Sequence, residues 1–283
     1  MYQFPIGAIV DCFGLELHEA IKTAARIGAN GLQMYSTTGA NSPENLVGQK
    51  RKDLLSFVKD NGLVFSAICG DLGQGFMHRE KNPMLIEKSK RIMDLAKDLE
   101  SDVVTTHIGV VPADRNHERY KIMQEACFEL AQYADSMGSH FAIETGPETA
   151  AVLKAFLDDL GSTGVAVNLD PANLVMVTGD DPVAAVYTLQ KYIVHTHAKD
   201  GVNLRKCDPE IIYRAIEHDN WDNEPSFKEV PLGQGSVDFP KYMKALEDIG
   251  YKGFLTIERE CGKDPAADIT MAADFLRQIM KNN

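Results

Sequence analysis

Short apolar runs and longer amphipathic segments alternate along the chain. The short runs are rich in valine, isoleucine and aromatic residues, a composition typical of strands buried on both faces. The predicted strands cover residues 4–11, 31–36, 64–71, 103–109, 141–146, 165–171, 192–200 and 254–260. Each is followed by a segment with a different periodicity, so the pattern predicts eight strand–helix pairs.

The segments between the strands carry apolar residues at three- and four-residue spacing, which is typical of helices that pack one face on a sheet. The predicted helices include residues 18–28, 84–100, 120–137, 181–192, 239–250 and 264–280. Strict alternation implies parallel strands joined by right-handed crossovers. Eight such units in 283 residues match a closed barrel. We therefore predict an α/β fold, a single (β/α)8 TIM barrel domain over residues 1–283.

An open, doubly wound sheet is the alternative architecture. Such a sheet usually carries a glycine-rich turn after its first strand. Here residues 11–20 read DCFGLELHEA, with one glycine, so the closed barrel is favoured. One connection interrupts the alternation: residues 201–234 show no clear helix and contain Trp221 and Pro225. Loops of this length are usually functional, which suggests a lid or substrate-binding loop, although a surface or subunit-contact excursion would explain it too.

The amino-acid composition argues against some classes of binding partner and location. The chain has 41 acidic and 29 basic residues, a net charge of −12, and no basic stripe interleaved with aromatics, which argues against nucleic acid. No apolar run reaches the roughly 18 residues of a membrane span. The first residues, MYQFPIGAIVDCFG, lack the basic region and cleavage site of a signal peptide. Five scattered cysteines form no C-x-x-C pair, which suits free thiols and a cytoplasmic location.

Four successive predicted strands end in side chains that can bind a metal: Glu144, Asp170, His197 and Glu258. In a barrel of this kind the carboxyl ends of the strands form the active-site mouth. Three converging carboxylates would repel one another by several kcal/mol at about 4 Å. A divalent cation removes that repulsion. Three oxygens and one imidazole suit manganese best, with magnesium, cobalt or zinc as further candidates.

Other polar residues near the strand ends are predicted to contact substrate. Lys199 shares a strand face with His197 and could bind a substrate oxygen or phosphate, or form a salt bridge to Asp200. His195 lies one layer deeper and is expected to support the site or the core. The remaining predicted substrate contacts are His107, Asn173, Glu229, Glu260, Gln33 and Asp71, with Tyr35 as a further residue that could line the pocket.

The segments AIETG, NLDPANL, HTHAKD, EVPLGQGSVDFP and GFLTIERE resemble the sugar phosphate isomerase/epimerase family, which has xylose-isomerase-like TIM barrels and includes the family 2 apurinic-site endonucleases. The resemblance covers nearly the whole chain and is strongest from about residue 140. It implies that Glu144, Asp170, His197 and Glu258 bind the metal. In the family's epimerases the two glutamates also move protons, which makes Glu144 and Glu258 the predicted catalytic pair.

The chain also departs from this family's pattern. Many relatives have histidine where this chain has Asn173, and the segment FKEVPLGQG lacks a histidine that the endonucleases use. The resemblance therefore implies one metal ion rather than three, and the Asn173 change argues against a standard free-ketohexose epimerase. The leading expectation is a metal-dependent isomerase or epimerase of a sugar, keto-sugar or sugar phosphate, acting through an enediolate.

Three other functions compete with that expectation. The first is an inosose or keto-sugar dehydratase that uses the same site, and a more distant one is an apurinic-DNA hydrolase. A non-catalytic sugar-binding barrel is the alternative from another class. The expected partner is a small polyhydroxylated substrate, and relatives commonly form homo-oligomers.

Overall fold

The strands of the protein close into a parallel barrel surrounded by helices. The computed structural model describes residues 2–216 and 224–282. Within these residues the barrel strands are β1 (Ile6–Ile9), β2 (Gly31–Tyr35), β3 (Val64–Cys69), β4 (Val103–Thr106), β5 (His140–Glu144), β6 (Val165–Leu169), β7 (Ile193–Ala198) and β10 (Leu255–Ile257). Their order around the barrel is β1-β10-β7-β6-β5-β4-β3-β2, and every pair is parallel. The predicted closed barrel is confirmed, and the open sheet is wrong.

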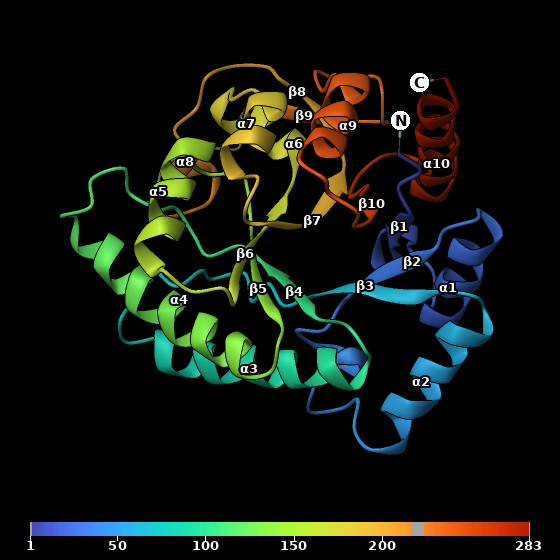
Figure 1. The fold of residues 1–283 in the computed structure, drawn as a ribbon, viewed down its shortest axis with the longest axis horizontal. Helices are drawn as coiled ribbons and strands as arrows, with labels where there is room; N and C mark the ends of the chain where they lie inside the picture. The colour runs from blue at the N-terminus through green and yellow to red at the C-terminus, as the bar shows by residue number, and fades with distance from the viewer. Residues whose placement is uncertain (1, 217–223, 283) are drawn as a thin grey trace.

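Helices cover the outside of this barrel (Figure 1). The longer helices are α1 (Leu17–Arg26), α2 (Gln49–Asp60), α3 (Asn82–Asp98), α4 (Glu118–Ser136), α5 (Ala150–Leu160), α7 (Pro182–Leu189), α9 (Phe239–Asp248) and α10 (Pro265–Asn282). Short turns of helix are η1 (Val10–Phe13), η2 (Gly39–Asn41), α6 (Pro171–Asn173), η3 (Leu174–Thr178) and α8 (Pro209–Ile212). None of the described helices is long and apolar enough to cross a bilayer.

Apolar side chains on the outer face of the strands pack against the buried faces of the helices and form the core. Phe141 and Ile143 of β5, for example, belong to the same buried cluster as Phe156 of α5 and Met123 of α4. The inner face of the strands is polar instead, with buried Gln33, Thr105, Asn168, His195 and Thr256. Buried polar groups are stable only when they bond to one another, and these residues do so.

The region predicted as a loop over residues 201–234 has regular structure of its own. The strands β8 (Asp200–Asn203) and β9 (Phe227–Val230) pair antiparallel, and the turn of helix α8 lies between them. The prediction of no helix here is wrong, because Asp208 caps α8 by accepting the Glu210 N–H, with Pro209 at the first helical position. Trp221 lies outside the described residues. We call residues 200–230 the β8–β9 excursion.

Candidate metal centre and substrate pocket

Four buried side chains meet at the carboxyl end of the barrel. Glu144 is the last residue of β5, Asp170 and Glu258 follow β6 and β10, and His197 lies near the end of β7. One ligand atom from each lies within 4.8 Å of the others. The four strands are neighbours in the barrel, so the sequence-predicted ligands are brought together by the closed topology.

The local chain direction aims one oxygen of Asp170 at this cluster. Asp170 is the N-cap of α6, and its Oδ1 accepts the N–H groups of Ala172 (2.7 Å) and Asn173 (2.9 Å). The other oxygen, Oδ2, is buried and has no hydrogen-bond partner. A cap of this kind fixes the carboxylate and leaves a lone pair for a ligand.

Two further atoms of the cluster also lack hydrogen-bond partners, although they lie close together. His197 Nδ1 and Glu258 Oε2 are 2.7 Å apart, yet neither has a hydrogen bond of acceptable geometry. Gln33 Oε1 lies 3.1 Å from His197 Nε2 and can accept its hydrogen, so Nδ1 is the ring nitrogen that faces the cluster and that a metal ion would use in place of a proton. Buried oxygen and nitrogen atoms that have no hydrogen-bond partner and converge on one point can bind a divalent cation. The residues present therefore suit a metal ion.

Electrostatics support the same interpretation. Burial raises the pKa of Asp170 to about 6 although His197 opposes this shift. Burial also raises the pKa of Glu258, but Lys199 and His197 outweigh it and lower that pKa below its ordinary value. Burial lowers the pKa of His197, and Glu258 and Glu144 raise it well above its ordinary value. A bound proton on His197 thus supplies the positive charge that a metal cation would supply instead.

Beneath the cluster, Asn168 contacts three of the inward-facing residues, namely Glu144, His195 and, at 3.2 Å from its Nδ2, the Nε2 of His197. Its Nδ2 donates to Glu144 Oε2 (3.1 Å), and its Oδ1 lies 2.9 Å from His195 Nδ1. The Nε2 of His195 contacts the Thr256 hydroxyl at 2.9 Å. His195 is therefore a buried supporting residue, where the sequence predicted it. Asn168 was not predicted, although it shares the inward face of its strand with Asp170.

Above the cluster lies a cavity of about 240 Å³. The predicted substrate contacts that line it are His107, Asn173, Lys199, Glu229, Glu260 and Asp71, together with Tyr35. Gln33 lies elsewhere than expected: it is 1% exposed and supports His197 from below instead of reaching the cavity. The cavity also has a wall that the sequence did not reveal, made of Cys69, Met176, Val177, Ile212, Tyr213 and Phe227.

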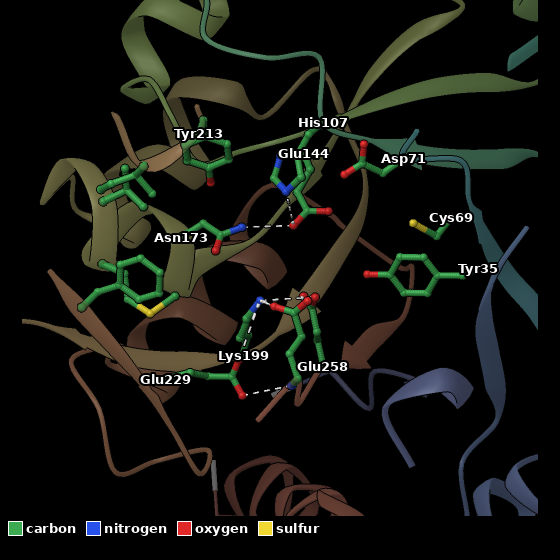
Figure 2. Close-up of a pocket in the computed structure, with 15 residues that line it drawn as sticks. Tyr35, Cys69, Asp71, His107, Glu144, Asn173, Lys199, Tyr213, Glu229 and Glu258 are labelled. Atoms are coloured by element: carbon green, nitrogen blue, oxygen red, sulfur yellow. Dashed lines mark hydrogen bonds and ion pairs between the residues drawn. The ribbon is translucent and has the colours of Figure 1, made fainter. Parts of the chain in front are cut away.

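Lys199 is surrounded by carboxylates on one side of this pocket. Its Nζ lies 3.2 Å from Glu258, 2.7 Å from Glu260 and 3.9 Å from Glu229. Figure 2 shows Lys199 facing Glu258 and Glu229. Burial lowers the pKa of Lys199, but Glu258 and its acidic neighbours raise it well above its ordinary value. Lys199 therefore stays charged, and these carboxylates take the place of the Asp200 partner considered from the sequence.

Glu229 and Arg259 hold the end of β10 in place. Glu229 Oε1 accepts hydrogen bonds from Arg259 Nη1 (2.7 Å) and from the Glu260 N–H (3.1 Å). Arg259 also binds Asp268 on α10. Glu229 comes from the β8–β9 excursion, so the excursion is tied to the strand end that carries Glu258.

The opposite wall of the pocket is built around Glu144. Asn173 Nδ2 donates to Glu144 Oε1 at 3.0 Å, and His107 Nε2 lies 3.5 Å from the same oxygen (Figure 2). Burial raises the pKa of Glu144, but His107 and His197 outweigh it and lower that pKa. Tyr213 of the β8–β9 excursion packs edge-on against His107, with ring centroids 5.4 Å apart. This wall combines an ionised carboxylate with an aromatic cover.

Comparisons with known proteins agree with this architecture. A family model for the xylose isomerase-like TIM barrel matches residues 21–279. In overall fold the protein is similar to a xylose isomerase domain protein from Planctomyces limnophilus, with a TM-score of 0.80, 24% identity, and coverage of 99% of this chain and 97% of the other. At that identity the likeness shows the fold.

Two enzymes are similar over shorter stretches. An inosose dehydratase of Clostridium beijerinckii is 27% identical over 157 residues, which cover 53% of this chain and 50% of the enzyme. An L-ribulose-5-phosphate 3-epimerase of Shigella flexneri is 40% identical over 62 residues, which cover 21% of this chain and 22% of the enzyme. The matched parts thus span half or less of either enzyme.

Proposed function

The chain belongs to the xylose isomerase-like TIM barrel family, and from this membership we propose that it is a metal-dependent isomerase or epimerase of a sugar, keto-sugar or sugar phosphate. One observation carries the proposal. Asp170 Oδ2, His197 Nδ1 and Glu258 Oε2 are buried without hydrogen-bond partners and converge at the floor of a polar cavity. Such an arrangement is unstable alone and suits a cation that also faces the substrate.

In this proposal Glu144, Asp170, His197 and Glu258 hold one divalent ion. Three carboxylates and one imidazole suit manganese best, and magnesium, cobalt and zinc accept similar donors. When bound, the ion supplies Lewis acidity toward the carbonyl and hydroxyl oxygens of the substrate. Asn168 and Gln33 orient two of the ligands from below, through the contacts described above.

The two glutamates are proposed to move the proton. Glu144 and Glu258 come from β5 and from the end of β10, which are separated in the barrel by β6 and β7. They can therefore stand on opposite sides of a flat carbonyl group. Glu258, ionised beside Lys199, takes the proton from the carbon next to the carbonyl and becomes neutral, and Glu144, which first takes up a proton from solvent, gives it to the opposite face of the same carbon. Removal on one face and return on the other inverts a carbon centre, which is an epimerisation.

The remaining lining residues are proposed to bind and orient the substrate. Asn173, His107, Asp71, Lys199 and Glu260 all line the pocket. A cavity of about 240 Å³ fits a small polyhydroxylated molecule rather than a polymer. A cytoplasmic location and a homo-oligomeric state remain predictions alongside this proposal.

Dehydration of a keto-sugar or inosose is the second candidate. The same glutamate would remove the proton, and the charged Lys199, 3.2 Å from Glu258, lies where it could stabilise a departing β-hydroxyl group. One of the similar enzymes is named an inosose dehydratase. The two candidates share the first proton transfer and differ in whether water leaves.

Hydrogen exchange tests the shared step. The protein is incubated in D2O with manganese and a panel of ketoses, inososes and their phosphates, and carbon-bound deuterium is followed by NMR and mass spectrometry. Exchange that requires metal and keeps the substrate mass, apart from deuterium, supports the isomerase or epimerase, whereas loss of water identifies the dehydratase. Absence of exchange across the panel, with metal bound, would reject both.

A further inference from the structure

A larger cavity lies beside the pocket above the metal centre. Its volume is about 650 Å³, against about 240 Å³ for the metal pocket. It is formed by residues 110–113 after β4, residues 147–149 between β5 and α5, the end of η3, and residues 206–210 of the β8–β9 excursion. Val177 is the one described residue that lines both cavities. We call the larger one the β4–β5 cavity, and the proposed reaction does not use it.

The deep wall of the β4–β5 cavity is mostly apolar. Its apolar residues include Val110, Val111, Pro112, Pro147, Val152 and Val177. All of these except Val152 of α5 are buried. A concave, largely apolar wall that carries a few polar groups is typical of a site for a small molecule, in which the polar groups orient the ligand.

One acid, Glu148, interrupts this apolar wall. Among the ionisable residues of the described lining it alone is buried, with 6% exposure. The Val111 N–H donates to Glu148 Oε2 over 3.4 Å, which is longer than usual, and Oε1 has no hydrogen-bond partner. A buried polar oxygen without a partner reduces the stability of the folded state, and a bound ligand that bonds to it recovers that loss.

The nearby helix N-terminus does not supply the missing partner. Helix α5 begins two residues after Glu148, with Thr149 as its N-cap. The Ala150 N–H donates to Asp180 at 2.8 Å, and the Val152 N–H donates to the Thr149 hydroxyl at 3.4 Å. These first N–H groups of the helix are therefore used by other residues, and Glu148 Oε1 stays available to a ligand.

The charged residues of the lining lie nearer its edge and do not pair with Glu148. Lys206 and Asp208 are exposed and have opposite charges, and Glu210 pairs with Arg119 of α4. The remaining titratable groups nearby are the half-buried Cys207 thiol and the Tyr213 hydroxyl, whose pKa burial raises well above its ordinary value.

In these surroundings Glu148 is a hydrogen-bond donor at neutral pH. Burial raises the pKa of Glu148 to about 8, although the Val111 N–H opposes this shift. A protonated carboxyl group has one O–H to donate. An acceptor group on a ligand therefore complements it, and a carbonyl oxygen is the acceptor that an otherwise apolar small molecule most simply carries.

We infer that the β4–β5 cavity binds a small neutral molecule that offers a carbonyl oxygen to the Glu148 carboxyl group and an apolar chain to the valines and prolines of the wall. This second site goes beyond the function proposed above, because it contains neither the metal ligands nor the proposed acid–base pair. A cationic ligand is disfavoured since it would require Glu148 to ionise within an apolar wall, and an anionic ligand since its own charge would be buried there.

Three short-chain probes of different charge test this inference without turnover. N-butylacetamide is neutral and has a carbonyl group, butylammonium is a cation, and butyrate is an anion. Their dissociation constants are measured by NMR titration in the presence of magnesium, with the methyl signals of Val110 and Val152 reporting the place of binding. At pH 6.5 the amide should bind at least about fivefold more tightly than either ion. At pH 9 its binding should be about tenfold weaker, because Glu148 has lost its proton.

Two substitutions of Glu148 separate its hydrogen bond from its charge. Glu148→Gln keeps an N–H donor and cannot ionise, so the amide should bind within about twofold of the original affinity at pH 6.5 and show no weakening at pH 9. Glu148→Leu removes the donor and should weaken amide binding about fivefold or more. Glu80→Leu, at an exposed side chain outside the cavity, is the control and should leave the affinity unchanged.

Three results would overturn the inference. The first is an absence of saturable amide binding at the cavity methyl groups, and the second is tighter binding of butylammonium, which would assign an ion pair to Glu148. The third is amide binding that Glu148→Leu leaves intact. Failure of the deuterium-exchange experiment, in contrast, concerns the metal pocket and does not affect this site.

Discussion

The two halves of the barrel mouth differ in charge. Around β5, β6, β7 and β10, each strand ends in or just before a carboxylate, or carries the cluster histidine, and the four residues are buried together. Around β2 and β3, the corresponding ends present Tyr35 and Cys69. Burial raises the pKa of both of these side chains above their ordinary values, so they remain neutral.

This contrast suggests that the two halves of the barrel mouth have different roles in catalysis and substrate binding. We call the ends of β5, β6, β7 and β10 the charged arc and the ends of β2 and β3 the neutral arc. The carboxylates of the charged arc repel one another unless a cation is bound, and they can also act as bases, which suits proton transfer. The neutral arc provides contacts for the rest of the substrate without competing for the ion. If this is correct, equal substitutions on the two arcs should have unequal effects, and the following predictions test that.

The largest difference is expected between Glu258→Gln and Asp71→Asn. The glutamine keeps the shape of Glu258 but cannot accept the proton, so exchange should fall by about 10²- to 10⁴-fold. Asp71→Asn changes a polar side chain just beyond the end of β3 and should cost less than about tenfold, the scale of one hydrogen bond. Metal content, measured by mass spectrometry, separates loss of the base from loss of the ion. Equal losses in the two metal-loaded variants would contradict this difference in roles.

A second test concerns Glu148, a buried acid behind the charged arc that has no ion pair in the described part of the chain. Burial raises the pKa of Glu148 to about 8, and its Oε1 has no hydrogen-bond partner. The folded state therefore binds a proton that the unfolded chain releases near pH 4.3, so this group lowers the free energy of unfolding as pH rises from about 4.3 to 8.

Glu148→Gln should remove that penalty. We expect little change at pH 5 and a gain on the order of a few kcal/mol at pH 8, from urea unfolding with chelator present. Glu80→Gln, at a side chain that is 74% exposed, serves as the control and should show no such difference. A gain of equal size at both pH values would mean that the charge of Glu148 is not the cause.

The third test examines the residue that supports the charged arc from below. Asn168→Ala removes the amide that contacts Glu144 and His195, and such supporting contacts typically change metal affinity by about 10- to 100-fold. Cys69→Ala, a substitution on the neutral arc, should leave the affinity for manganese within about twofold, because burial keeps this thiol neutral and among the described residues it forms no side-chain hydrogen bond with the cluster. Titration with manganese followed by electron paramagnetic resonance gives both constants.

The sequence predicted the barrel and the four cluster residues because both depend on short-range regularities. Strand–helix alternation has a clear period, and a polar residue such as Glu144 or Asp170 at the end of an apolar run stands out. Helix α2 had no predicted range, since only Leu54 and Val58 on it are buried and the apolar face is short. The ends of strands were predicted too long, as at His107, which lies one residue beyond β4.

Other parts of the site depend on contacts between distant residues. Gln33 lies near the end of β2, where a pocket residue would be expected. Only the three-dimensional structure shows that its side chain contacts His197 instead of the cavity. Tyr213 comes from the β8–β9 excursion, where no hydrophobic periodicity in the sequence predicts the direction of its side chain.

The smallest expected effect concerns Gly146, where the charged arc meets the excursion. A Cβ at Gly146 would overlap the Tyr213 hydroxyl, while the ring carbon that bears this hydroxyl would be 3.2 Å away. Gly146→Ala should therefore displace Tyr213 and cost about 1 kcal/mol in substrate binding, roughly a fivefold increase in KM, with kcat nearly unchanged.

Removing the hydroxyl should relieve this overlap and make the test specific. In a Tyr213→Phe background, Gly146→Ala should cost clearly less than it does alone, because the atom with which the new methyl group collides is gone. A double-mutant cycle in KM measures this coupling directly. If the two substitutions are additive, Tyr213 does not lie over Gly146 in the working enzyme, and the excursion then contributes Glu229 to the site but no cover over the charged arc.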